Sequence, residues 1–407
     1  MIRFSALVRG VLLAFILAGA ALADDAIKVP LQTQRTWDFA NAGVHFDCNF
    51  SGARLGGCEQ TGDHEFRVLV TPENQPINPS PWYAFKVRSD KSQTITVRLV
   101  YIHEGPRGRP WLSRDGSEWS RIEERRFARW PETNAVSVRL DVEPRPLWVA
   151  AWEVVGLEEM SGWTDKMCRL PFAREETAGR SIEGRSLRAF VLGETTNANF
   201  VFVIGRQHPP EITGTMGLES FVETIAGDSD LARRFRRQFQ LVVLPVMNPD
   251  GVEHGHWRSN LGGVDLNRDW RKFSQPETAA TRDWLLHYIK LPGARSALFL
   301  DFHSTGTNIF YSVPEEKGDV DPGFTDRWLA DLHRECPKFA FERDDSHNAN
   351  EATSKAWAHE QMHAPAITCE FGYATDRKLI RRAAKIEAED MMRLLLAASA
   401  KTPVRAE

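Results

Sequence analysis

The sequence predicts a three-layer α/β fold with a mixed, mainly parallel sheet, preceded by an antiparallel β-sandwich. Short alternating strands separated by clusters of glycine, proline and asparagine indicate the sandwich, as in HEFRVLV (64–70) and QTITVRLVYI (93–102). Farther along the chain, apolar runs alternate with helical stretches, which is typical of a sheet covered by helices on both faces. We therefore expect a β-sandwich domain over 24–155 and an α/β domain over 156–402.

The elements of the α/β part follow from hydrophobic periodicity. NFVFVIG (199–205) and ALFLDF (297–302) have the length and apolar content of buried strands. Helices are expected over about 215–226, 277–290, 325–336 and 376–399. NPDG (248–251) predicts a turn. Because open α/β sheets place their sites beyond the carboxyl ends of parallel strands, polar residues that follow these strands are the first candidates for a functional site.

The first 23 residues have the pattern of a secretory signal peptide. Arg3 and Arg9 precede an apolar stretch (11–20), and the ALA at 21–23 fits a small-x-small cleavage site. We therefore expect cleavage after Ala23 and an exported protein, periplasmic or secreted. No later segment is apolar over the thickness of a bilayer, so the mature chain is expected to have no membrane span.

The charge balance argues against some classes of partner. The chain has 51 basic and 55 acidic residues, and a nucleic-acid partner would favour a clear excess of basic charge. Two basic clusters, at 233–238 and 377–382, fall within expected helices and are interpreted as solvated helix faces.

The chain has five cysteines, an odd number for an exported protein. Cys48 and Cys58 flank a glycine-rich segment that could turn back on itself. The sequence is therefore compatible with two alternatives, a disulfide between them or two free thiols. Cys369 precedes Glu370, and on a strand its side chain would point to the opposite face, which favours core packing over a nucleophilic role.

A candidate metal site combines His208 and Glu211, in RQHPPE, with His303, in DFHS. Pro209 and Pro210 exclude a helix interior between the first two, so this pair is expected on a loop after a strand. Two neutral imidazoles and one carboxylate suit a zinc ion that keeps a position open for water. Taken singly, each residue also fits an ordinary role as a loop histidine, a capping glutamate or a strand-end histidine.

Asp301 lies two residues before His303 on the same expected strand. It fits two roles, as the acceptor for the other N–H of the His303 imidazole or as a plain strand-end acid.

The ordered set HPPE, NPDG, HWRSN, VDLNRDW, FLDFHS and TCEFG, spread over about 200–372, resembles the zinc carboxypeptidase family of the carboxypeptidase A type. The resemblance implies that one zinc ion per chain is held by His208, Glu211 and His303.

The same resemblance implies roles for four further residues. Arg258 would polarise the scissile carbonyl and stabilise its oxyanion, and Glu370 would be the general base that passes a proton from water to the leaving amine. Asn267 and Arg268 would bind the terminal carboxylate of the substrate. The chemistry agrees, because a carboxylate is best bound by the planar two-donor fork of arginine.

The leading part of the chain is similar to the cytosolic carboxypeptidase subfamily, in FDCNFSGARL (46–55) and PINPSPWYAFKVRS (76–89). The subfamily's arrangement implies a β-sandwich ahead of the catalytic domain. The expected export signal means that the tubulin-tail substrates of its eukaryotic members cannot simply be carried over, and a fold alone does not define a substrate.

One departure from the family pattern concerns the loop before the catalytic glutamate, where the family usually has a tyrosine that closes over the substrate. No tyrosine occurs between Cys336 and Glu370. The segment DDSHNANEATS (344–354) offers His347 or an asparagine as a substitute, or no substitute at all.

A competing metal motif is HEQMH (359–363), whose spacing places two histidines on one helix face, as in zinc proteases of another fold. Pro365 argues against it, because the helix should end just before this residue. Glu387 or Glu389 is the nearest candidate for a third ligand, although no motif singles out either of them.

These observations favour a zinc-dependent metallocarboxypeptidase that removes C-terminal residues from peptides or proteins, cell-wall peptides being one option. A zinc amidase or deacylase on the same scaffold would keep the metal site and use the arginines on another carboxylate. A third alternative is a non-catalytic binding protein whose β-sandwich recognises a partner.

Overall fold

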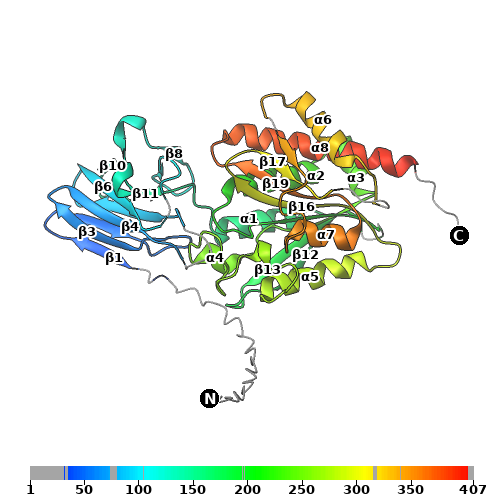
Figure 1. Ribbon diagram of the computed structural model, residues 1–407, viewed down its shortest axis with the longest axis horizontal. Helices are drawn as coiled ribbons and strands as arrows, with labels where there is room; N and C mark the ends of the chain where they lie inside the picture. The colour runs from blue at the N-terminus through cyan, green and yellow to red at the C-terminus, as the bar shows by residue number, and fades with distance from the viewer. Residues whose placement is uncertain are drawn as a thin grey trace, which may run out of the picture.

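A computed structural model describes residues 32, 35–73, 80–103, 105–194, 196, 198–314, 319–339 and 341–401. The expected signal peptide lies outside these residues. The β-rich part, coloured blue to cyan, lies beside the α/β part, coloured green to red (Figure 1). Within the described residues no helix combines the length and the apolar character needed to cross a membrane.

The β-rich part is a sandwich of two sheets around one core. One sheet has the order β1-β2-β5-β11-β7-β8, formed by β1 (Thr36–Phe39), β2 (Val44–Asp47), β5 (Ala84–Ser89), β11 (Leu147–Ala150), β7 (Trp111–Ser113) and β8 (Ser120–Arg121). The other has the order β3-β4-β6-β10-β9, formed by β3 (Gly57–Gly62), β4 (Glu65–Val70), β6 (Gln93–Tyr101), β10 (Ala135–Val142) and β9 (Phe127–Trp130). Inward residues of both sheets share a core that includes Phe46, Phe66, Val87 and Val97.

The expected antiparallel pairing is confirmed for all described strand pairs of the sandwich except one. Strands β4 and β6 are parallel neighbours, with Val68 opposite Leu99. Between them the chain crosses to the other sheet to form β5 and then returns, so it enters β6 in the same direction as β4.

Both Cys48 and Cys58 are free thiols, so the disulfide alternative is wrong. Cys48 follows β2 in one sheet and Cys58 lies in β3 of the other. The glycine-rich segment between them therefore crosses between the sheets instead of turning back. Cys48 is buried, and its thiol contacts the backbone oxygen of Arg35 at 3.5 Å.

The α/β part contains an eight-stranded mixed sheet with the order β12-β13-β15-β14-β16-β19-β17-β18. Its strands are β12 (Ala173–Arg180), β13 (Ser186–Leu192), β14 (Asn199–Gly205), β15 (Gln240–Leu244), β16 (Arg295–Thr305), β17 (Ile309–Tyr311), β18 (Glu342–Asp344) and β19 (Ala366–Gly372). The four central strands β15, β14, β16 and β19 are parallel, as predicted, and antiparallel pairing brings in the outer strands on both sides.

Helices cover both faces of this sheet, which confirms the three layers. Above the sheet in Figure 1 lie α2 (Ile212–Ala226), α3 (Asp230–Arg236), α6 (Phe324–Glu335) and α8 (Arg377–Lys401). Below it lie α5 (Pro276–Ile289) and α7 (Ser354–Met362). Side chains of β14 alternate between the layers, with Val201 and Val203 in one core and Phe200 and Phe202 in the other.

Two short helices complete the fold and were not predicted. Helix α1 (Leu157–Cys168) joins the sandwich to β12, and α4 (Pro249–Glu253) starts at the expected turn. The Asn248 side chain caps α4 by accepting from the N–H of Gly251 at 2.9 Å, with Pro249 at the first helical position. The residues of the turn signal therefore begin a helix.

Helix α2 approaches the sheet closely because two of its residues have no side chain. A Cβ atom at Gly214 would overlap the backbone of His303 in β16, and one at Gly217 would lie 2.6 Å from the ring of Phe371. Glycine at these positions allows the start of the helix to rest directly on the strand that carries His303.

We expect Gly214→Ala to lower the free energy of unfolding by about 1–3 kcal/mol, because the added methyl group has to displace backbone. Gly162→Ala in α1 is the matched control, since its new Cβ would meet no neighbour. The control should be stabilised by about 0.5–1 kcal/mol, because alanine restricts the unfolded chain. Urea unfolding of both variants checks this, and equal stabilities would contradict the close approach.

Candidate active site

A cavity of about 650 Å³ lies at the carboxyl ends of the parallel strands, where the α/β part faces the sandwich. All seven residues expected to form the site line this one cavity: His208, Glu211, Arg258, Asn267, Arg268, His303 and Glu370. The sandwich contributes Arg107 and Trp152 to the same walls. Arg107 and Glu370, 263 positions apart in the sequence, therefore meet in one place.

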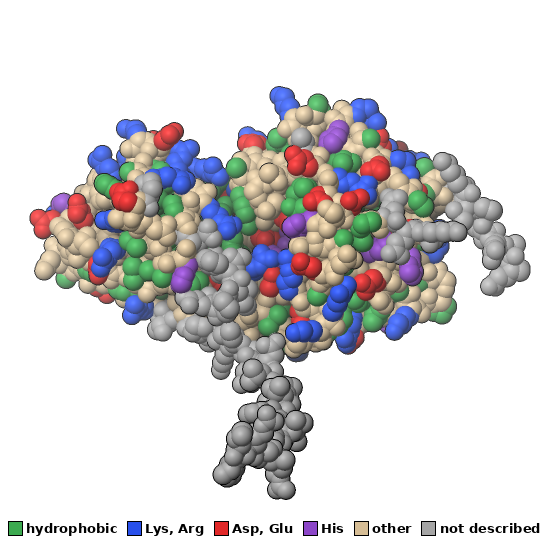
Figure 2. Space-filling view, in the orientation of Figure 1, with side chains coloured by type: hydrophobic (Ala, Val, Ile, Leu, Met, Phe, Trp, Pro, Cys, Tyr) green, Lys and Arg blue, Asp and Glu red, His purple; other side chains and the backbone are tan. Residues whose placement is uncertain are grey.

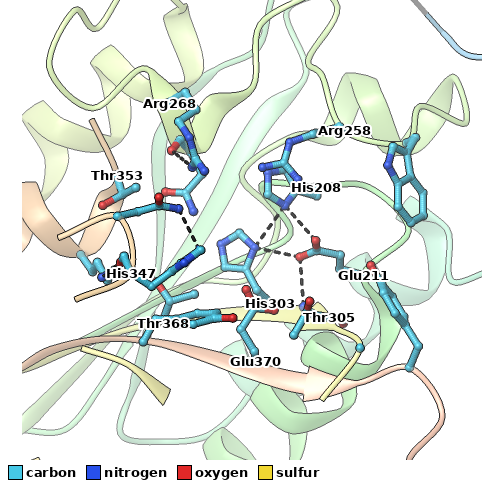
Figure 3. A pocket seen from close by; sticks show the side chains of 18 of the residues that line it. His208, Glu211, Arg258, Arg268, His303, Thr305, His347, Thr353, Thr368 and Glu370 are labelled. Atoms are coloured by element: carbon cyan, nitrogen blue, oxygen red, sulfur yellow. Dashed lines mark hydrogen bonds and ion pairs between the residues drawn. The ribbon is translucent and has the colours of Figure 1, made fainter. Parts of the chain in front are cut away.

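His208, Glu211 and His303 converge closely enough to hold one metal ion. Their candidate ligand atoms all lie within 4.8 Å of one another, and all three side chains are buried. The Glu211 carboxylate is 2.8 Å from Nδ1 of His208 through one oxygen and 2.8 Å from Nδ1 of His303 through the other (Figure 3). The two Nδ1 atoms are 3.2 Å apart, so both rings present the same nitrogen to the centre.

The local sequence explains how these side chains reach the centre. His208 and Glu211 are on the loop that follows β14, as Pro209 and Pro210 require, and Glu211 directly precedes α2. His303 lies near the end of β16, the neighbouring parallel strand.

Each imidazole is fixed by a carboxylate on its outer nitrogen. Nε2 of His303 is 2.9 Å from Asp301, which also accepts a hydrogen bond from Gln207 at 2.6 Å, so the positioning role considered for Asp301 fits the geometry. Nε2 of His208 is 3.0 Å from Asp265. Such contacts orient metal-binding histidines and fix which nitrogen is free to bind. The sequence interpretation missed Asp265, although it lies in the quoted segment VDLNRDW.

The electrostatics of this centre favour a cation. Burial by itself would lower the pKa of both histidines, but Glu211 and nearby aspartates outweigh it and hold the pKa of His208 and that of His303 above the ordinary value. Burial by itself would raise the pKa of Glu211, but the two imidazoles lower it. The donor set and its negative surroundings therefore fit a divalent ion such as zinc.

Arg258 is held beside the centre by two carboxylates. Its Nε donates to Asp265 at 2.7 Å, the same side chain that orients His208. Its backbone N–H donates to Glu73 of the sandwich at 2.8 Å. This arrangement leaves the terminal nitrogens of the guanidinium to face the cavity, where they can donate to a developing negative charge.

Arg268 and Asn267 lie on the short helix η3 (Leu266–Arg268), and both line the cavity. Nε of Arg268 is 3.0 Å from Glu351, and one of its terminal nitrogens donates to the backbone oxygen of Asn267 at 2.8 Å. The side-chain oxygen of Asn267 accepts from the N–H of Ser354 at 3.0 Å, which leaves its NH₂ group to donate. Figure 3 shows Arg268 on the same side as Thr353 and His347.

Glu370 lies on β19 directly across from His303 in the parallel register. Burial raises the pKa of Glu370 to about 7, with His303 acting against burial and Glu211 adding to it. A carboxyl group with a pKa near neutrality can both accept and return a proton, which suits a general base.

Aromatic residues from other parts of the chain line the cavity where the family's lid tyrosine is missing. His347, the proposed substitute, does line it, and the ring of Tyr311 stacks on His347 with centroids 4.4 Å apart. Tyr373 and Trp257 line the same cavity. Sequence spacing gave no signal for these rings.

The competing motif HEQMH does not form a metal site within the described residues. Helix α7 ends at Met362, as Pro365 implied, and His363 is exposed with a left-handed backbone. His359 is buried, and its Nδ1 is 3.2 Å from the backbone oxygen of Ala364. Neither Glu387 nor Glu389 joins these histidines in a cluster of ligands.

The fold and the cavity together define the class of zinc-dependent peptide hydrolases. Residues 163–391, more than half of the chain, match the sequence profile described as Zinc carboxypeptidase. The chain belongs to the zinc carboxypeptidase family.

Curated relatives and solved structures agree with this assignment. The chain is 22% identical over 319 residues to Cytosolic carboxypeptidase 6 of Caenorhabditis elegans, covering 70% of each protein. It is 22% identical to the mouse protein of that name, of which it spans 53%. A metallo-carboxypeptidase from Burkholderia cenocepacia has the same fold, with a TM-score of 0.73, 20% identity, and coverage of 88% of this chain and 100% of that one.

We expect purified protein to contain zinc and His208→Ala to lose it, because the variant removes one of three ligands. Two variants serve as controls that remove no ligand of the centre: Glu370→Gln, and His363→Asn in the competing motif. Elemental analysis after dialysis measures the metal content of all four proteins. Zinc lost from His363→Asn but retained by His208→Ala would contradict the assignment of the centre.

Proposed function

We propose that this protein is a zinc-dependent metallocarboxypeptidase that hydrolyses the C-terminal residue from peptides. The observation that carries the proposal is the placement of Arg268 and Asn267 in the same cavity as the metal-binding triad and Glu370. This pair offers several N–H donors to a free terminal carboxylate, at one side of the centre where the bond would be cleaved.

The residues of the cavity divide the chemistry among them. Zinc, when bound by His208, Glu211 and His303, makes water a better nucleophile and polarises the scissile carbonyl. Glu370 accepts a proton from the attacking water and returns it to the leaving nitrogen, which becomes the free amine of the released residue. Arg258 donates to the carbonyl oxygen as negative charge develops there, and Asp265 keeps its guanidinium in place.

We expect the C-terminal residue of the substrate to have an acidic side chain, because a buried lysine lines the cavity. Lys355 on α7 lines the cavity and is only 2% exposed. Its ammonium group donates to the backbone oxygens of Ser312, at 2.8 Å, and His347, at 2.7 Å, and one N–H remains. An incoming carboxylate would pair with this cation and with the neighbouring Arg268, whereas a lysine or arginine side chain would be repelled.

The protonation state of Lys355 should make the preference for an acidic terminal residue depend on pH. Burial lowers the pKa of Lys355 to about 8. The ammonium is therefore charged below that pH and neutral above it. We expect the ratio of kcat/KM for a peptide ending in glutamate to one ending in glutamine to fall as the pH rises through about 8. Lys355→Met should lower this ratio about tenfold at pH 7 and remove its pH dependence. If the ratio for the wild type does not change with pH, the proposed role of Lys355 is refuted.

The terminal-carboxylate clamp is tested with peptides that have a free or an amidated C-terminus. We expect Arg268→Ala to lower kcat/KM about a hundredfold on free C-termini, because a bidentate charged contact is lost. Arg271→Ala is the matched control, since Arg271 is exposed and pairs with Glu360 outside the cavity. Comparable activity on the amidated peptide in the wild type would favour the amidase alternative instead.

We also propose that the protein acts after export, as the pattern of residues 1–23 indicates. N-terminal sequencing of the protein recovered from the periplasm or the medium should begin at Asp24. Recovery in the cytoplasm with the first 23 residues intact would reject this proposal.

A further inference from the structure

The backbone around Arg258 depends on the sandwich for its hydrogen bonds. The N–H groups of Arg258 and Ser259 both donate to one oxygen of Glu73, at 2.8 and 3.3 Å. Among the described residues, no group of the α/β part accepts from either N–H. Ser259 is buried, and a buried N–H without an acceptor is costly. This segment is therefore complete only when the sandwich supplies its acceptor.

Glu73 is completely buried and is held in place from within the sandwich. The side chain of Arg54 donates to the backbone oxygens of Thr71, at 3.2 Å, and Pro72, at 2.9 Å, directly before Glu73. Arg54 is itself paired through its backbone with Ala84 of β5, at 2.9 and 3.0 Å. Its guanidinium is also a neighbouring positive charge that offsets the buried carboxylate. The acceptor for the Arg258 segment therefore has a defined position relative to the sheets of the sandwich.

The residues that lead to this arginine also lie close against the sandwich. Gly255 has a positive φ of 61°, and a Cβ atom there would lie 2.4 Å from the backbone oxygen of Ala53. The hydroxyl of Ser51 donates to the carboxylate of Glu253 at 2.6 Å. Figure 2 shows the two parts of the chain in contact along the middle of the molecule. The segment 253–259 is thus fixed to the sandwich at both of its ends.

Two carboxylates hold Arg258 at opposite ends of the residue. Glu73 accepts from its backbone N–H, and Asp265 accepts from its Nε at 2.7 Å. The backbone position determines where the terminal nitrogens of the guanidinium can reach. A backbone shift of about 1 Å would carry these donors away from the place where negative charge develops, which is costly for catalysis.

We propose that Glu73 is a positioning residue for the reaction, which holds the backbone of Arg258 so that the guanidinium faces the scissile carbonyl. The inference rests on the proposed carboxypeptidase function, in which Arg258 stabilises the developing oxyanion. The sandwich thereby contributes to the chemical step through a side chain that does not touch the substrate. Because Arg258 acts on charge that appears only in the transition state, loss of Glu73 should lower kcat and leave KM nearly unchanged.

The test measures kcat and KM of the zinc-loaded protein on one peptide with a free C-terminus. We expect Glu73→Ala to lower kcat about tenfold and to change KM less than about twofold. Glu73→Gln keeps an acceptor oxygen and should retain most of the wild-type kcat. If Glu73→Ala does not fold, Glu73→Asp takes its place, because its shorter side chain withdraws the acceptor.

Ser51→Ala is the matched control, since it removes another hydrogen bond between the two parts of the chain without touching the Arg258 backbone. The control should keep the kcat of the wild type. Equal kcat values for Ser51→Ala and for the variant that lacks the acceptor would overturn the positioning role.

A double variant shows whether Glu73 acts through Arg258. Arg258→Ala alone should lower kcat about a hundredfold, because an oxyanion donor is lost. Adding Glu73→Ala to it should lower kcat no further, since the group that Glu73 positions is already absent. A merely structural role would instead multiply the two losses, and that result would overturn the proposal.

Failure of the proposed function has a different signature. If the zinc-loaded wild type cleaves no peptide with a free C-terminus, the carboxypeptidase activity is rejected. Hydrogen–deuterium exchange at the amides of Arg258 and Ser259 then decides whether Glu73 holds this segment. Faster exchange in Glu73→Ala than in Ser51→Ala supports that role, and equal exchange overturns it.

Discussion

The active-site cavity is organised by one carboxylate placed between two buried imidazoles. Glu211 lies 2.8 Å from the inner nitrogen of both His208 and His303, and carboxylates hold the outer nitrogens. A buried group of this kind is costly unless its charges balance. Three acids, Glu211, Asp265 and Asp301, contact the two rings, and Arg258 pairs with only one of them, Asp265. The centre therefore requires positive charge, which a divalent ion supplies while keeping both imidazoles neutral.

The sandwich also takes part in the site, because it helps to hold Arg258. Asp265 links the ring of His208 to the guanidinium of Arg258, and Glu73 of the sandwich accepts the backbone N–H of Arg258. The side chain of Asn248 links the segments that carry His208 and Arg258 by donating to the backbone oxygens of Gln207 and Ser259, each at 3.1 Å. The position of Arg258 relative to the metal thus depends on contacts from both parts of the chain.

The sequence predicted the residues whose type and order carry a signal, and missed those that matter only through contact in space. His208 and Glu211 could be found because a proline pair and a preceding apolar strand place them at a strand end. Asp265 reaches His208 from 57 positions away, a distance for which no spacing rule exists. Nothing in the sequence distinguishes Lys355 from an ordinary helix lysine, because its burial depends on how α7 packs against the sheet. The parallel pair β4 and β6 was missed because its direction depends on a crossing to the other sheet.

The distribution of charge in the cavity follows from the chemistry at its centre. A free carboxylate is itself a good ligand for zinc, so a peptide C-terminus could bind the metal directly and block the open position. In the proposed function Arg268, with Asn267, would supply an alternative partner at one side of the triad and draw the terminal carboxylate away from it, while Lys355 would pair with an acidic side chain. The scissile carbonyl, which is neutral, is then the group left beside Arg258 and the metal. If the protein acts as we propose, positive charge beyond the triad would therefore contribute to catalysis by determining which oxygen of the substrate reaches the centre.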